Sequence, residues 1–141
     1  MRVDAENFST APVERILARH PKLSGVAVYP VPDERTADDQ VMAALELTAG
    51  ESFDPEEFGA FLDAQADLGT KWAPRYLRIT TLPVGATNKV DKRPLRAARW
   101  YTDDPLYWRA DRRGPYRPFT SDDREALQAR FLEHGRTIDR V

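Results

Sequence analysis

Residues 75–92 read Arg-Tyr-Leu-Arg-Ile-Thr-Thr-Leu-Pro-Val-Gly-Ala-Thr-Asn-Lys-Val-Asp-Lys, and the expected architecture is built around this segment. Arginines are interspersed with apolar residues over 75–79, which predicts a half-buried β-strand. The strand leads into a loop, 82–89, whose glycine and small residues permit a close approach to a ligand. The loop ends at Lys89, and a lysine ammonium is a compact, flexible charge that suits a phosphate or a carboxylate.

Further apolar runs at 26–31 and 41–47 predict two more strands that pair with each other. The order helix, strand, strand, helix, strand, loop, helix, helix predicts an α+β fold, with a small mixed sheet flanked by helices. Residues 1–141 are therefore expected to form a single domain, with a core over 1–119 and a C-terminal helix over 120–141. Helix starts are predicted at Ser9 or Thr10, Asp54, Lys92, and Thr120 or Ser121.

The helix that follows Asp54 has the strongest start signal in the sequence. Asp54 is the expected N-cap, Pro55 occupies the first helical position, and Glu57 completes a capping box. Phe53 and Phe58 have the spacing of a hydrophobic staple. In contrast, the segment 109–117 combines charge with glycine and proline, and it is predicted to be the most mobile loop.

Composition excludes several functional classes. The net charge is only -2, which provides no general attraction to nucleic acid or to an acidic membrane. Cysteine is absent, and the two separated histidines, His20 and His134, do not form a zinc site, so no metal site is expected. No segment approaches the roughly 20 apolar residues that cross a bilayer. We therefore expect a cytoplasmic protein whose membrane contact, if any, is peripheral.

The pattern Leu82-Pro-x-x-x-Thr87-x-Lys89-x-x-Lys92 resembles the last core motif of the AMP-forming adenylating enzymes, which include acyl-CoA ligases, peptide-synthetase adenylation domains and luciferases. Other segments resemble this superfamily in the same order. Residues 3–14 look like the region just beyond its interdomain hinge, 28–32 with 41–45 like two strands, and 53–58 like a helix. Residues 104–108 and 116–120 are similar to the tail of the fatty-acid transport protein and very-long-chain acyl-CoA synthetase branch.

This resemblance implies the mobile C-terminal domain of a fatty-acid–CoA ligase whose N-terminal ATP- and acyl-binding domain lies outside residues 1–141. Such a ligase joins a fatty acid to AMP from Mg-bound ATP and then transfers the acyl group to CoA. The implied catalytic residue is Lys89, within a motif that also holds Thr87, Asn88, Lys92 and Arg93. The expected partners are the N-terminal domain and the small-molecule substrates. The domain alone is expected to bind no cofactor and to be inactive.

The resemblance also implies a loop for the thioester step, near the CoA site. It comprises Asp4, Ala5, Glu6, Asn7 and Phe8. Most relatives have glycine where this chain has Ala5 and Asn88. Asparagine tolerates unusual backbone angles, whereas alanine at positive φ is strained by about 1 kcal/mol.

A second hypothesis concerns the basic segment after the lysine loop. Its cations could hold the phosphates of CoA, or they could form a solvated helix face or interdomain salt bridges. These residues are Lys92, Arg93, Arg96 and Arg99. The three tryptophans, Trp72, Trp100 and Trp108, are expected to anchor the core or an interface.

The alternative to a ligase domain is a stand-alone, non-catalytic module that binds a protein partner or nucleic acid. Segment 93–117 would provide its surface, because arginines there are interspersed with four aromatic residues: Trp100, Tyr101, Tyr107 and Trp108. Three aspartates in the same segment, Asp103, Asp104 and Asp111, argue against nucleic acid. The chain also begins just after the expected hinge, which favours a piece of a longer ligase.

Overall fold

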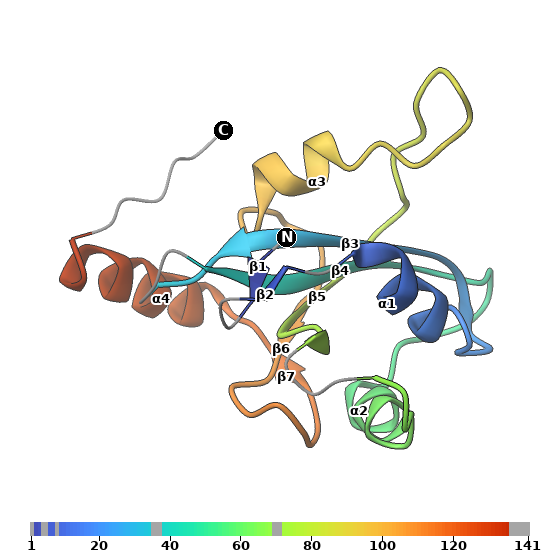
Figure 1. The fold of residues 1–141 in the computed structure, drawn as a ribbon, viewed down its shortest axis with the longest axis horizontal. Coiled ribbons are helices and arrows are strands. Elements are labelled where there is room, and N and C mark those ends of the chain that lie inside the picture. Colours follow the sequence, from blue (N-terminus) through green and yellow to red (C-terminus); the bar gives the residue numbers. More distant parts are fainter. Residues whose placement is uncertain (1, 4–5, 8, 35–37, 69–71, 136–141) are drawn as a thin grey trace.

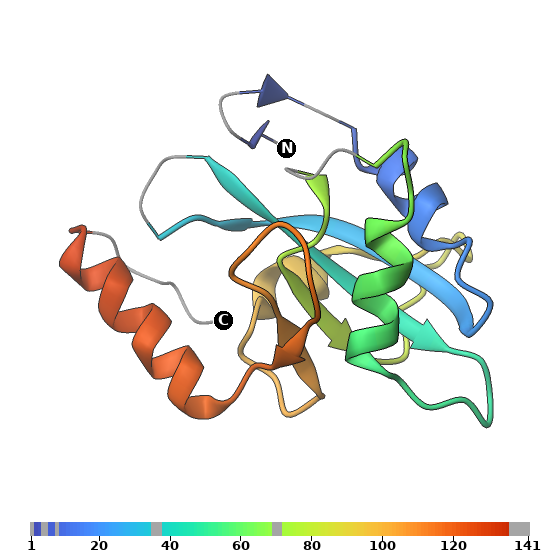
Figure 2. The same ribbon diagram turned by 90° about the horizontal axis from the view of Figure 1, so that it is seen from below.

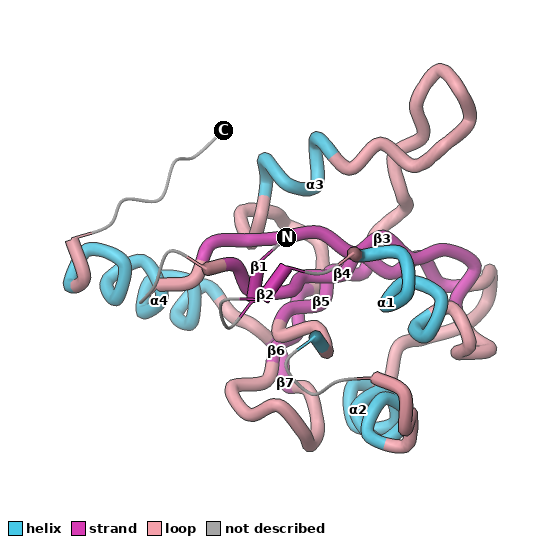
Figure 3. Tube along the Cα trace, in the orientation of Figure 1, coloured by secondary structure: helices cyan, strands magenta, loops and turns pink. Residues whose placement is uncertain are grey.

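The computed structural model describes residues 2–3, 6–7, 9–34, 38–68 and 72–135. Within them, a five-stranded sheet is surrounded by four helices, and a separate two-stranded hairpin lies near the N-terminus (Figures 1 and 3). The strands are β1 (Arg2–Val3), β2 (Glu6–Asn7), β3 (Leu23–Pro32), β4 (Asp39–Leu47), β5 (Tyr76–Ile79), β6 (Leu106–Trp108) and β7 (Arg117–Pro118). The helices are α1 (Thr10–Leu17), α2 (Pro55–Asp63), α3 (Arg93–Ala98) and α4 (Ser121–Glu133).

The large sheet has the strand order β3-β4-β5-β6-β7 and mixes the two kinds of pairing. Strands β3 and β4 are antiparallel, as an apolar run followed by a polar turn and a second apolar run predicts. Strands β4 and β5 are parallel, and α2 lies in the connection between them. The remaining pairs, β5 with β6 and β6 with β7, are antiparallel. The predicted α+β class with a small mixed sheet is confirmed.

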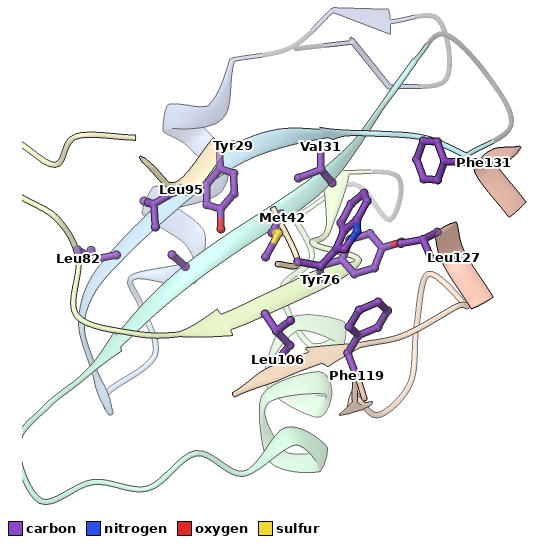
Figure 4. Close-up of a cluster of buried hydrophobic side chains, with 13 residues drawn as sticks. Tyr29, Val31, Met42, Tyr76, Leu82, Leu95, Leu106, Phe119, Leu127 and Phe131 are labelled. Atoms are coloured by element: carbon purple, nitrogen blue, oxygen red, sulfur yellow. The ribbon is translucent and has the colours of Figure 1, made fainter. Parts of the chain in front are cut away.

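Helices cover both faces of this sheet (Figures 1 and 2). Helices α1 and α2 pack on one face, where Val28, Leu45 and Leu77 belong to one buried cluster. Helices α3 and α4 pack on the other, where the close-up in Figure 4 shows the second cluster. The second cluster includes Tyr29, Val31, Met42, Tyr76, Leu82, Leu95, Trp100, Leu106, Phe119, Leu127 and Phe131.

Because helices cover both faces of the sheet, the prediction for strand β5 is corrected. Strand β5 was expected to be half-buried, but Tyr76 is 2% exposed in the second cluster and Leu77 is 0% exposed in the first. Strands buried on both faces show long apolar runs rather than strict alternation, which is the pattern seen in β3 and β4. Strands β6 and β7 were not predicted, because three and two residues are too few for a periodic signal.

The start of α2 confirms most of its predicted signals. The Asp54 carboxylate accepts hydrogen bonds from the backbone N–H groups of Glu56 and Glu57, at 3.0 and 3.2 Å. The rings of Phe53 and Phe58 lie 5.5 Å apart, as a hydrophobic staple requires. The predicted capping box fails at Glu57. Its carboxylate lies 2.8 Å from Nε2 of the buried His20, because a buried imidazole needs a hydrogen-bond partner.

Helix α4 begins as predicted but ends earlier than predicted. Thr120 and Asp123 form a reciprocal capping box at its start. The helix ends at Glu133, and Gly135 adopts a φ of 69°, a left-handed conformation that commonly terminates helices. Of the predicted helix over 120–141, the described residues thus form helix over 121–133, and residues 136–141 lie outside the described part of the chain.

The segment 109–117, expected to be mobile, is tied to the C-terminal end of α2. The Arg109 guanidinium donates to Oδ1 of Asp63 at 3.1 Å and to the carbonyl oxygen of Gly114 at 3.0 Å. The backbone N–H of Gly114 donates to the other Asp63 oxygen at 2.8 Å. Arg109 is only 5% exposed and stacks on the Tyr116 ring at 4.6 Å. These contacts anchor the segment, so the prediction of mobility is not supported.

Candidate functional site

The lysine hairpin, residues 83–91, projects from the body of the domain beyond α3 (Figure 1). Val84 and Val90 form an isolated antiparallel bridge across its stem. The N–H of Gly85 donates to the carbonyl oxygen of Lys89 at 2.8 Å, and the N–H of Asp91 donates to that of Pro83 at 2.8 Å. The predicted loop is therefore a short hydrogen-bonded hairpin, which holds its backbone in a defined shape.

Asn88 makes the turn of this hairpin possible. Its φ is 63°, in the left-handed region that most side chains avoid, and its N–H donates to the carbonyl oxygen of Gly85 at 3.0 Å. Asparagine occupies this region more readily than most other non-glycine residues do. Position 88 therefore has a positive φ, which glycine would also adopt. The tolerance of asparagine for unusual backbone angles, expected from the sequence, agrees with this conformation.

Lys89 lies on the exposed part of the lysine hairpin, directly after Asn88. No hydrogen bond or ion pair joins its ammonium to another residue of the ranges that the structure describes. Thr87, at the tip, is exposed as well. The hairpin therefore offers a cation whose three donors are all available to an anionic ligand.

Lys92, three residues further on, has the opposite environment. Its ammonium donates to the carbonyl oxygen of Val28 at 2.8 Å and to the Thr10 hydroxyl at 3.2 Å, and it pairs with Oε2 of Glu14 at 3.0 Å. Three acceptors thus face its three donors. This binding to the domain competes with the predicted role of Lys92 in holding CoA phosphates.

The three arginines predicted to bind phosphate together with Lys92 lie in different surroundings. Arg93 is 90% exposed and binds Asp91 through two hydrogen bonds of 2.9 Å. These bonds hold the pKa of the Asp91 carboxyl below its usual value. Arg96 and Arg99 instead line a surface groove together with the β3 segment 30–32 and Asp39. The structure therefore leaves Arg96 and Arg99 better placed than Lys92 to meet an external phosphate.

Most of the predicted thioester-step loop lies outside the residues that the structure describes. Asp4, Ala5 and Phe8 are not among the described residues. Glu6 and Asn7 form β2, which pairs with β1 in the antiparallel N-terminal hairpin. Neither Figure 1 nor Figure 2 places this N-terminal hairpin beside the lysine hairpin. Of the predicted thioester-step loop, the described residues Glu6 and Asn7 therefore do not lie beside the lysine hairpin.

Two of the residues expected to form a nucleic-acid or protein-binding surface over 93–117 are buried in the domain. Trp100 is 0% exposed within the second core cluster, and Arg109 is buried against α2. Across the residues that the structure describes, no group of three or more histidine, aspartate or glutamate side chains could hold a metal ion. Likewise, none of the described helices is long and apolar enough to cross a membrane.

No protein-family model matches the chain, but comparison with known proteins finds relatives of it. The chain is 49% identical over 138 residues to a steroid-22-oyl-CoA synthetase from Rhodococcus jostii (strain RHA1), a match that covers 96% of this chain and 25% of that protein. It is 52% identical over 108 residues to a medium/long-chain-fatty-acid–CoA ligase from Mycobacterium tuberculosis, covering 76% of this chain and 21% of that one. The chain is a homologue of the C-terminal portion of acyl-CoA ligases.

Solved structures support the same assignment for this acyl-CoA ligase homologue. The amide bond synthetase McbA from Marinactinospora thermotolerans superposes with a TM-score of 0.61 at 33% identity, over 73% of this chain and 20% of that one. An acyl-CoA synthetase from Brucella canis gives 0.60 at 27% identity, over 69% and 18%. The ligase homologue therefore spans about a quarter or less of the length of the proteins that it matches.

Sequence reasoning missed the residues that hold Lys92 in this ligase homologue. Glu14 and Thr10 lie in α1, about 80 positions before Lys92 in the sequence, and Val28 contributes a backbone oxygen. No local pattern links positions so far apart, because only the packing of α1 on β3 brings them to the base of the lysine hairpin.

Proposed function

We propose that this chain is the C-terminal domain of an AMP-forming fatty-acid–CoA ligase, in which it supplies Lys89 for formation of the acyl-adenylate. The observation that carries the proposal is the Lys89 ammonium, which has no partner among the described residues and lies on a projecting, hydrogen-bonded hairpin. It occurs in a chain about half identical to two CoA ligases. The partner is the N-terminal domain of the same protein, and the ligands are a fatty acid, Mg-bound ATP and CoA.

The chemistry explains why a positioned cation is needed. In the first half-reaction a fatty-acid carboxylate oxygen attacks the α-phosphorus of ATP, and pyrophosphate leaves. Two anions must approach, so charge accumulates around the reacting atoms in the transition state. A lysine ammonium directed there offsets this repulsion more strongly in the transition state than in the ground state, by a few kcal/mol. In the second half-reaction the CoA sulfur attacks the acyl carbonyl carbon, and AMP leaves.

In this proposal the two half-reactions use different segments of the domain. The lysine hairpin serves adenylation, and the segment 4–8 serves thioester formation. Arg96 and Arg99 are proposed to contact CoA phosphates at the groove beside β3, a role that their lack of an ion pair with any described residue favours. The ligase works in the cytoplasm, where ATP and CoA are available, and any membrane contact is peripheral. Membership of the very-long-chain branch remains a prediction.

Separate assays of the two half-reactions in the full-length ligase test the role of Lys89. Lys89→Ala should lower fatty-acid-dependent ATP–pyrophosphate exchange by about 100-fold or more, because one transition-state contact of this kind contributes that much. Thioester formation from supplied acyl-adenylate and CoA should stay within about threefold of the unmodified enzyme. Lys22→Ala, in the segment between α1 and β3, is the lysine control. Equal losses in both half-reactions would refute the assignment.

A further inference from the structure

The lysine hairpin is fastened to the domain at both of its ends by carboxylates. At its start, the backbone N–H of Leu82 donates to Oε1 of Glu46 in β4 at 2.7 Å, and the Leu82 side chain is buried. At its end, Lys92 pairs with Glu14 of α1 at 3.0 Å. Between these two attachments, the backbone–backbone hydrogen bonds found among the described residues run within the hairpin itself. The direction in which Lys89 points therefore depends on the two attachments.

The attachment at Lys92 is the more elaborate of the two. Oε2 of Glu14 pairs with the Lys92 ammonium and also accepts from the backbone N–H of Val28, at 2.8 Å. The carbonyl oxygen of Val28 accepts from Lys92 in turn, at 2.8 Å. The side chains of Lys92 and Glu14 are 32% and 23% exposed, so solvent and salt screen this pair less than a fully exposed one. The Lys92 ammonium thus joins both β3 and α1 to the lysine hairpin.

A lysine suits this junction better than an arginine does. Three acceptor oxygens, from Glu14, Val28 and Thr10, converge on a single nitrogen. An ammonium has three donors on one atom, whereas a guanidinium distributes its donors over a planar fork. The junction also includes the first residue of α1, and the segment 4–8 lies only a few residues before that helix. The hairpin is consequently fixed to the same helix that follows the predicted thioester-step segment.

We infer that Lys92, held by Glu14, is a positioning residue that aims the lysine hairpin and thereby places the Lys89 ammonium for adenylation. This inference rests on the proposed function, because it gives Lys92 no contact with substrate and makes it act through Lys89. A displacement of about 1 Å at a reacting group can cost about 100-fold in rate. Loosening the base of a projecting hairpin should therefore affect adenylation more than it affects the stability of the fold.

The test compares variants of the full-length ligase in the two half-reactions. Lys92→Met keeps a long, uncharged side chain and removes both hydrogen bonds and the ion pair. It should lower kcat of ATP–pyrophosphate exchange by about 10- to 100-fold, with KM for ATP and fatty acid changed by less than about threefold. Thioester formation from supplied acyl-adenylate should change by less than about threefold. Lys22→Met is the matched control, and it should leave both half-reactions unchanged.

Two further variants separate positioning from a general structural role. Lys92→Arg keeps the charge and the pair with Glu14 but not three donors on one atom, so it should recover only part of the exchange activity lost in Lys92→Met. Glu14→Gln retains an oxygen for the Val28 N–H but loses the ion pair, so it should reproduce the exchange defect to a smaller degree. In combination with Lys92→Met it should add little, because both changes break one interaction.

Each other outcome has a definite meaning. Unchanged exchange in Lys92→Met overturns the inference, as does an equal loss in both half-reactions together with a lower melting temperature. Unchanged exchange with a raised KM for CoA overturns it in favour of a phosphate contact. Lys89→Ala, assayed in parallel, keeps the proposed function separate. If it abolishes exchange while Lys92→Met does not, only the positioning role fails; if it leaves exchange intact, the proposed function fails as well.

Discussion

Two loops of similar sequence character place their cations in opposite environments. The lysine hairpin, 83–91, and the segment 109–117 both combine glycine, proline and basic residues. In the first, Lys89 is exposed and has no partner within the described ranges. In the second, Arg109 is buried in an ion pair with Asp63, and the backbone of Gly114 bonds to the same carboxylate.

This difference follows from what each loop faces. Segment 109–117 lies against the C-terminal end of α2, where the Asp63 carboxylate accepts hydrogen bonds from Arg109 and Gly114. Within the segment, the Tyr116 ring stacks on the Arg109 guanidinium. The lysine hairpin extends away from the sheet, and its acidic residue Asp91 is already bound by Arg93. A buried cation that is paired contributes to stability, and an exposed cation without a partner remains available for chemistry. Four substitutions test this division by their effect on the free energy of unfolding.

The largest effect is expected for Arg109→Ala. It removes the guanidinium from a pair in which the arginine is buried, leaving Asp63 with one fewer charged partner and Tyr116 without its stacking group. The free energy of unfolding should fall by about 3 kcal/mol, as measured by urea denaturation. Arg117→Ala, in the same segment but exposed, should cost less than about 0.5 kcal/mol. Similar losses for the two arginines would mean that the anchoring at Asp63 contributes little.

Gly59→Ala tests how closely α2 packs on the anchored segment. A Cβ at this position would lie 2.5 Å from the carbonyl oxygen of Gly114 and 3.1 Å from Cα of Pro115, so backbone must move. Alanine has a helix propensity about 1 kcal/mol more favourable than glycine. Overpacking should cancel this gain and lower the free energy of unfolding by about 2 kcal/mol more. Gly85→Ala in the lysine hairpin is the control, since its nearest neighbour would be an ordinary 3.6 Å away. Stabilisation by Gly59→Ala would show that segment 109–117 yields easily.

Asn88→Ala should have an intermediate effect, confined to the lysine hairpin. Alanine at a φ of 63° is strained by about 1 kcal/mol. Glycine is unstrained there, so Asn88→Gly should change the free energy of unfolding by less than about 0.5 kcal/mol. The two variants should be compared by urea denaturation and, in the full-length ligase, by ATP–pyrophosphate exchange. If alanine and glycine behave alike in both measurements, the left-handed conformation of Asn88 does not matter.

Lys89→Ala should have the smallest effect on stability, although it is expected to have the largest effect on adenylation. An exposed side chain without a partner contributes less than about 0.5 kcal/mol, so the urea midpoint should not move measurably. A loss above about 1 kcal/mol would indicate that the ammonium is held by the domain, as Lys92 is, and would remove the contrast between the two loops.

Local sequence signals predicted where helices begin better than they predicted the tertiary contacts of each segment. Asp54 and Thr120 cap α2 and α4 as expected, because a cap depends on residues within one turn of helix. Glu57 departs from its predicted capping box because His20, 37 positions away, takes its carboxylate. The same reason explains the failure at 109–117. Its glycine, proline and charges indicate a loop, but only Asp63 decides whether that loop is anchored.

The sequence by itself determined the fold class, the helix starts and the lysine-bearing loop, and its resemblance to the adenylating enzymes indicated the catalytic role proposed for Lys89. These features depend on periodicity, caps and short motifs, which act over a few residues. Tertiary structure alone decided which cations are bound and which are free. The partners of Lys92 and Arg109 come from α1, β3 and α2, and only the packing of helices on the two faces of the sheet brings those oxygens within hydrogen-bond distance.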